Sequence, residues 1–154
     1  MERNQTKKII ISFAVIILVA GLGSVFVNLG MAWFNSLNKP SQWIPNIVIP
    51  IVWTVIYLAF AVINFVWLKN DDIPKTTVIL MLINGFLNVL WCLTFFTLKQ
   101  LLIGNIVIVI NLIAGFALIV DIFKYKNLYA YILSIYPVWL SIATTLNLAL
   151  WILN

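Results

Sequence analysis

Few side chains in this 154-residue chain could do chemistry. The chain has no histidine, one cysteine (Cys92) and four carboxylates, Glu2, Asp71, Asp72 and Asp121. Histidine is the commonest metal ligand and general base, so we exclude zinc sites, histidine-based triads and haem ligation through histidine. One cysteine can form neither an intramolecular disulfide nor a CxxC redox pair. The sequence therefore predicts no metal site and no acid–base catalytic centre.

Tryptophan and asparagine side chains recur at helical spacing. Residues three or four apart share one helix face, and three such stripes are present: Trp53, Tyr57, Phe60, Asn64 and Trp67; Asn84, Asn88, Trp91 and Phe95; and Trp139, Ala143, Leu146 and Leu150, with Asn147 one step off the line. Flat aromatic faces with a few amides suit a flat, mostly apolar ligand. The alternative is that these side chains only pack the helices together.

The composition is that of a membrane protein. Apolar residues make up 64% of the chain and charged residues 8%, whereas a soluble domain has about 45–50% and about 25%. Net charge is +5, but in a membrane chain loop lysines that fix orientation explain it. We therefore expect a lipid bilayer, and no nucleic acid, as the surroundings of this protein.

Five transmembrane helices account for the apolar segments, because about 20 apolar residues cross a hydrocarbon core roughly 30 Å thick. We predict spans at residues 9–28, 47–68, 76–98, 101–123 and 128–152. The chain must turn at Lys99 and Gln100, since residues 76–123 as one helix would exceed any bilayer. The expected fold is all-α, a five-helix membrane bundle formed by a single domain over residues 1–154.

Polar residues inside the spans should face the bundle interior, because lipid offers them no hydrogen-bond partner. The asparagines concerned are Asn64, Asn84, Asn88, Asn111 and Asn147. Asp121 is the one charge within a span, and we predict a local, solvated pair with Lys124. So little charge at membrane depth disfavours an ion-driven pump. Cys92 is expected to be an inert core thiol.

Basic residues predict the orientation. Seven fall on one side of the predicted spans (Arg3, Lys7, Lys8, Lys69, Lys75, Lys124 and Lys126) and two on the other (Lys39 and Lys99). This asymmetry places the N-terminus in the cytoplasm and the C-terminus outside. The loop at residues 29–46, with its tryptophans and prolines, then faces outward. It is either an interfacial anchor or a lid over a cavity.

Four strings, in order along residues 33–151, carry a family resemblance. They are WFNSLNKPS at 33–41, PIVWTVIY at 50–57, LNVLW at 87–91 followed by FF at 95–96, and YPVWL at 136–140 followed by ATTLN at 143–147 and Trp151. They resemble the WYxxLxKPS, PVWxxLY, LNxxWxxxFF and YPxxWLxxATTLN motifs of the translocator protein family (TspO/MBR, the tryptophan-rich sensory proteins).

The resemblance implies a five-helix bundle, commonly a homodimer, with a cavity closed by the first loop. It implies binding of tetrapyrroles such as protoporphyrin IX or haem, as ligands and not as required cofactors. The ligand contacts that it implies are Trp53, Asn88, Trp91, Trp139, Ala143 and Leu146, with Trp33, Lys39, Pro40 and Trp43 in the lid. In bacterial relatives, tryptophans at the places of Trp53 and Trp139 are implicated in light-dependent porphyrin breakdown.

The chain departs from the family pattern at three places. Residues 41–46 read SQWIPN where the family has WxPP, so the second proline is missing. Leu148 and Ile152 replace the tyrosine and the basic residue of the sterol motif, and we therefore expect no dedicated sterol site. Ile103 replaces a tryptophan that is frequent early in the fourth helix.

Three functions remain open on these grounds. The first is a tetrapyrrole-binding receptor or carrier in porphyrin homeostasis or stress sensing, in a bacterial cytoplasmic membrane, with the ligand carboxylates near Lys39. The second is light-dependent porphyrin degradation, with Trp53 or Trp139 as the redox-active side chain. The third is a structural accessory subunit of another membrane protein, in which the tryptophans only pack.

Overall fold

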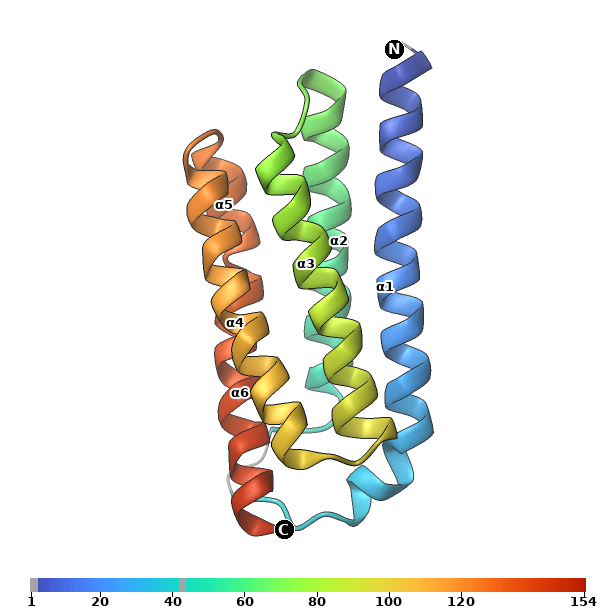
Figure 1. The fold of residues 1–154 in the computed structure, drawn as a ribbon, viewed down its shortest axis with the longest axis vertical. Coiled ribbons are helices and arrows are strands. Elements are labelled where there is room, and N and C mark those ends of the chain that lie inside the picture. Colours follow the sequence, from blue (N-terminus) through green and yellow to red (C-terminus); the bar gives the residue numbers. More distant parts are fainter. Residues whose placement is uncertain (1–2, 42–43) are drawn as a thin grey trace.

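The computed structural model describes residues 3–41 and 44–154 as a bundle of helices that run along one long axis (Figure 1). The helical elements in chain order are α1 (Arg3–Ser36), α2 (Val48–Asn70), α3 (Lys75–Cys92), the π-helix η1 (Leu93–Thr97), α4 (Leu101–Phe123), α5 (Asn127–Leu133) and α6 (Ile135–Leu153). Within the described residues, five helical segments are long and apolar enough to cross a membrane, with α3 and η1 forming one and α5 and α6 another. The predicted all-α, five-span architecture is confirmed.

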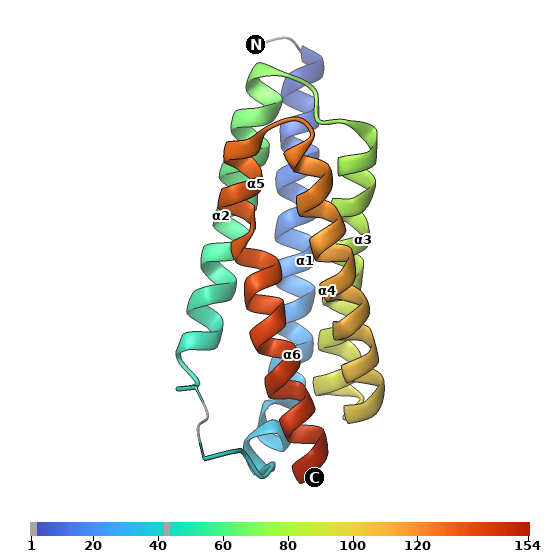
Figure 2. The same cartoon turned by 90° about the vertical axis from the view of Figure 1, so that its left-hand side faces the viewer.

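The helices are arranged so that α1 contacts α2, α3 and η1, while α4 contacts α3, η1, α5 and α6. The N-terminus and the α2–α3 and α4–α5 connections lie at one end of the bundle, and the C-terminus lies at the other (Figures 1 and 2). The bundle exterior is apolar, as lipid requires: Ile17, Phe86, Ile113 and Ile152 are each more than 60% exposed. The chain is therefore an integral, multi-pass membrane protein.

The first helix is longer than predicted, and the expected loop at residues 29–46 is correspondingly wrong in its first part. Helix α1 continues to Ser36, so Trp33 and Phe34 lie on its last turns. The prediction ended the helix where the apolar run reached membrane length. Nothing in the sequence breaks a helix before Lys39-Pro40, and backbone hydrogen bonds carry it beyond the apolar core.

The third span ends in a π-helix. The backbone N–H of Leu98 donates to the carbonyl of Leu93, five residues back, at 2.9 Å. The wider turn places Phe95 and Phe96 in succession in the core, at 0% and 7% exposure. Lys99 then adopts a left-handed conformation, with φ of 57°, and the chain reverses where the sequence predicted a turn.

The fifth span is broken at Ser134, although the sequence predicted one helix over residues 128–152. Pro137 has no N–H, so the carbonyl of Leu133 loses its helical partner. The hydroxyl and the backbone N–H of Ser134 both donate to the carbonyl of Ala130, at 2.7 and 2.9 Å. Helix α5 therefore ends at Leu133, and α6 begins at Ile135.

The five span asparagines all face inward, as predicted, with exposures between 0% and 6%. A sixth buried amide, on Asn105, was not singled out from the sequence, although it lies in the same apolar surroundings. Its Nδ2 donates to the carbonyls of Leu101, at 2.9 Å, and Asn147, at 3.3 Å. It thereby connects α4 to α6.

The carboxylate of Asp121 is buried, whereas the sequence predicted a solvated ion pair. Its carboxylate does bind Lys124 Nζ, at 3.0 Å, but the side chain is only 5% exposed. The hydroxyl of Thr77 on α3 donates to the other carboxylate oxygen at 2.7 Å. The carboxylate is buried because α3 packs on α4 at this depth, which a local spacing rule cannot reveal. Cys92 is buried, as expected.

Gly30 of α1 lies directly against the backbone of η1. A Cβ at Gly30 would overlap the carbonyl group of Phe96 and lie 2.8 Å from Phe96 Cβ. We expect Gly30→Ala to lower the free energy of unfolding by about 1–3 kcal/mol, because the overlap is with backbone that cannot change rotamer. Thermal unfolding in detergent measures the effect.

Gly21→Ala is the matched control on the same helix, since its Cβ would meet nothing within 4 Å. Alanine favours a helix over glycine by about 0.5–1 kcal/mol, so this variant should unfold at the wild-type temperature or slightly above it. Equal melting temperatures for Gly30→Ala and Gly21→Ala would contradict the described contact between α1 and η1.

Candidate functional site: an aromatic cluster between two cavities

Trp53 lies at the centre of an aromatic cluster built from α2, α3 and α6. Its ring stacks on Tyr57 at a centroid distance of 5.9 Å and lies 6.0 Å from the ring of Trp91. The ring of Tyr136 meets it edge-on at 6.4 Å. Trp91 in turn contacts Phe95, at 6.2 Å. Rings at these distances fix one another's orientation.

A small cavity of about 30 Å³ borders this cluster. Five of the six ligand contacts implied by the resemblance line it: Trp53, Trp91, Trp139, Ala143 and Leu146. The fold therefore brings these residues together from three separate spans. The space holds a water molecule or two, so a larger ligand requires the surrounding helices to move apart.

Three buried hydrogen-bond donors lie among the residues around the small cavity without an acceptor in the described part of the chain. They are Nε1 of Trp91, Nε1 of Trp139 and Nδ2 of Asn147. A buried polar group without a partner costs free energy. Three unpaired donors in one place therefore favour a guest that carries acceptor atoms.

A much larger cavity, of about 640 Å³, lies on the other side of Trp53, between α1, α2 and α3. Trp53 lines both cavities. Asn88, the sixth implied contact, lines the larger cavity, where its Oδ1 accepts a hydrogen bond from the Tyr57 hydroxyl at 3.2 Å. The volume falls within the range of about 300–1,000 Å³ that is usual for small-molecule sites.

Residues of the stripes predicted in the second and third spans line the larger cavity, but the sequence did not predict that α1 forms another of its walls. Its α1 wall consists mainly of apolar residues whose spacing carries no chemical signal. Two polar residues interrupt this wall: Lys8, and Ser12, whose hydroxyl accepts a hydrogen bond from Asn64 Nδ2 at 3.0 Å. A lone serine in an apolar helix does not reveal which neighbour it will meet.

The predicted lid residues are placed near the end of α1. The ring of Trp33 packs edge-on against Phe95, at 6.0 Å. Lys39 Nζ donates to the carbonyl of Phe34 at 3.0 Å and lies 4.8 Å from the centre of its ring. Pro40 is half-buried, and Trp43 lies outside the described residues.

The loop after α1 is tied to the C-terminal residue of the chain. The backbone N–H of Asn38 donates to Asn154 Oδ1 at 2.9 Å, and Asn154 Nδ2 donates to the Asn38 carbonyl at 3.0 Å. This pair connects the loop to the end of α6. It limits how far the loop can swing without breaking both bonds.

The hydroxyl of Tyr136 holds the cluster in place from α6, because it donates to Asn111 Oδ1 on α4 at 3.0 Å. We expect Tyr136→Phe to lower the free energy of unfolding by about 1–3 kcal/mol, since the buried amide oxygen loses its partner. Chemical or thermal unfolding measures it. Tyr131→Phe, at a position 69% exposed, should leave stability unchanged, and equal losses in both variants would contradict this role.

The chain is similar to known proteins over most of its length. A sequence model of the TspO/MBR family matches residues 11–152. The chain is 28% identical over 127 residues to protein CrtK of Rhodobacter capsulatus, covering 80% of this chain and 79% of CrtK. It is 28% identical to the tryptophan-rich protein TspO of Archaeoglobus fulgidus, covering 96% and 97%. It is 32% identical to the human translocator protein, covering 84% and 80%.

Proposed function

The chain belongs to the TspO/MBR family, and from that premise we propose that it binds a tetrapyrrole such as protoporphyrin IX or haem within its helix bundle. In this role it acts as a membrane receptor or carrier in porphyrin homeostasis or stress sensing. The observation that carries the proposal is the position of Trp53, whose indole separates the two cavities and lines both. A flat macrocycle gains most from burial against such a ring.

The larger cavity supports this function by its size and by its mostly apolar walls. A macrocycle in it would lie against Trp53 and could reach Asn88. Contacts with Trp139, Ala143 and Leu146 require the small cavity to widen, since it measures about 30 Å³. Ligand binding is therefore expected to shift the population towards a more open arrangement of the helices around Trp53.

The same premise supports a homodimer in a bacterial cytoplasmic membrane with a cytoplasmic N-terminus. The distribution of charge supports the orientation: seven of the nine basic residues lie in the first two turns of α1 or in or next to the α2–α3 and α4–α5 connections, at one end of the bundle. Lys39 and Lys99 lie in the connections at the other end. Cytoplasmic ends of membrane proteins are enriched in lysine and arginine.

The proposal predicts saturable quenching of tryptophan fluorescence when purified protein is titrated in the dark with protoporphyrin IX, at about one pigment per chain. Trp53→Phe and Trp139→Phe should each weaken affinity about threefold to tenfold, since an aromatic contact contributes about 0.5–1.5 kcal/mol. Trp67→Phe, in the separate cluster with Tyr129, is the matched control and should bind like wild type. Linear quenching that ignores all three substitutions would contradict the proposal.

Light-dependent porphyrin breakdown is the alternative that the cluster also supports, because Trp53 and Trp91 lie 6.0 Å apart beside the candidate ligand space. The described part of the chain offers no acid–base pair at this depth, so turnover would depend on the photochemistry of the pigment. Illuminating the complex separates the two functions. A product that forms in light and is lost in Trp53→Phe favours breakdown, and unchanged pigment favours binding alone.

A further inference from the structure

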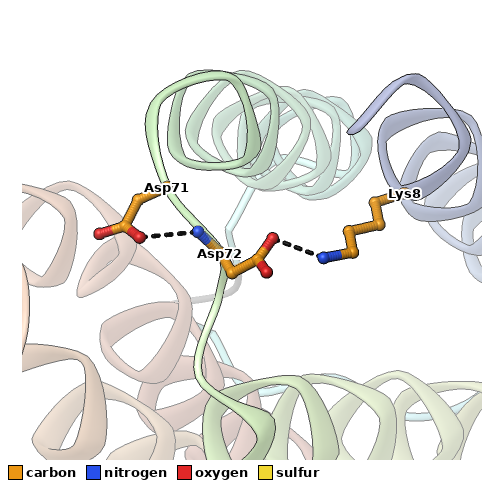
Figure 3. Close-up of polar contacts among 3 residues, drawn as sticks. All are labelled: Lys8, Asp71 and Asp72. Atoms are coloured by element: carbon orange, nitrogen blue, oxygen red, sulfur yellow. Dashed lines mark hydrogen bonds and ion pairs between the residues drawn. The ribbon is translucent and has the colours of Figure 1, made fainter. Parts of the chain in front are cut away.

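The larger cavity reaches the end of the bundle at an ion pair between Lys8 of α1 and Asp72 of the α2–α3 connection. Lys8 Nζ lies 2.6 Å from Asp72 Oδ1, and both residues line the cavity. Figure 3 shows the two side chains reaching towards each other across the space between the helices. They are the charged residues among those that line this cavity.

The ion pair between Lys8 and Asp72 can be replaced by a pair between Lys8 and another anion. The side chains of Lys8 and Asp72 are 39% and 67% exposed, and exposed ion pairs are weak because water competes for both charges. The backbone of Asp72 is fixed independently of Lys8, since its N–H donates to Asp71 Oδ1 at 2.8 Å. Asp71 in turn lies 3.8 Å from Lys126 Nζ. Another carboxylate could therefore replace Asp72 at Lys8 while the connection keeps its other contacts.

Polar groups continue inward from this end at successive depths of the cavity. Asn64 Oδ1, Asn84 Oδ1 and Asn88 Nδ2 are buried and have no hydrogen-bond partner in the described residues. All three asparagines line the cavity, and each is at least 94% buried. The amide of Asn84 faces α4, because a Cβ at Gly115 would lie 3.6 Å from its Oδ1. Asn64 and Asn88 are therefore the amides that a guest in this mostly apolar cavity can meet, once their side chains turn towards it.

From these observations we propose that the cavity between α1, α2 and α3 binds an amphipathic carboxylic acid, and that Lys8 holds its carboxylate in place of Asp72. The apolar body of the ligand extends along the cavity towards Trp53. Hydrogen-bonding groups on that body pair with Asn64 and Asn88 once these side chains turn towards the cavity. The ligand enters from the basic end of the bundle and not from the end that carries Lys39.

Two sources can supply this chemistry. A tetrapyrrole acid has carboxylates at one edge and ring nitrogens that can donate and accept, so it fits the asparagines best. In that case the proposal rests on the function proposed above and locates the ligand's acidic edge. A fatty acid from the bilayer has the carboxylate and the apolar body but no groups for the asparagines.

The test uses the full chain in nanodiscs of neutral lipid, titrated with three probes. The probes are protoporphyrin IX, its dimethyl ester, which lacks free carboxylates, and the fluorescent fatty acid cis-parinaric acid. Lys8→Gln removes the cation and Asp72→Asn removes the competing anion. The matched controls are Lys7→Gln, a neighbour that does not line the cavity, and Lys39→Gln at the opposite end.

The expected result is opposite effects of the two substitutions. Lys8→Gln should weaken binding of protoporphyrin IX about fivefold, the upper range for a single exposed pair. Asp72→Asn should strengthen it, because Lys8 is then free. The dimethyl ester should not respond to either substitution, and the two control variants should bind protoporphyrin IX like wild type.

Other outcomes decide between the proposals. Equal losses in Lys8→Gln and Asp72→Asn, or no change in either, would show that the ion pair only joins α1 to the α2–α3 connection and would overturn the inference while leaving porphyrin binding intact. A response to Lys39→Gln alone would overturn it as well. A third outcome separates the two proposals. If cis-parinaric acid binds more weakly to Lys8→Gln and more tightly to Asp72→Asn while protoporphyrin IX does not saturate, the carboxylate site is supported and the tetrapyrrole function is contradicted.

Discussion

The structure depends on one constraint: a polar side chain inside a bilayer must find its partner within the protein, because the hydrocarbon core contains no water. The span asparagines meet this constraint by facing inward, and they thereby set which side of each helix faces lipid. Asn84 Nδ2, for example, donates to the carbonyls of Leu80 and Ala114, at 2.8 and 3.1 Å, and so connects α3 to α4. The tryptophans on the same helix faces therefore lie in the interior as well.

The interior that results is uneven, and the proposed ligand site follows from this unevenness. At the end near Lys99, glycines allow close contact: Gly30 meets the backbone of η1, and a Cβ at Gly104 would lie 2.8 Å from the ring of Phe95. Towards the opposite end, a cavity of about 640 Å³ lies between α1, α2 and α3, and α1 is joined to α2 there by the hydrogen bond between Asn64 and Ser12. Trp53 lies where the tightly packed part gives way to the open part. A ligand that reaches it from the open end therefore meets rigid aromatic walls.

The sequence predicted much of this arrangement, because hydropathy and the hydrogen-bonding needs of asparagine act on each helix separately. The spans, the turn at Lys99 and the inward amides required no knowledge of neighbouring helices. Features that arise between helices were not predictable. The burial of Asp121 depends on Thr77, 44 residues away, and the π-helix η1 and the larger cavity depend on how α1 packs. Contacts implied by the resemblance, such as Trp139, are brought together, but around a space that must widen before a macrocycle fits.

The most direct test of the account is ¹⁹F NMR of protein labelled with 5-fluorotryptophan, recorded during titration with protoporphyrin IX in the dark. The ring current of a bound porphyrin shifts the resonances of the indoles that it faces. The account predicts saturable shifts for Trp53, Trp91 and Trp139 and none for Trp67, which lies in a separate cluster. Shifts confined to Trp151, which is 44% exposed on the bundle surface, would show that the pigment binds outside the bundle and would contradict the account.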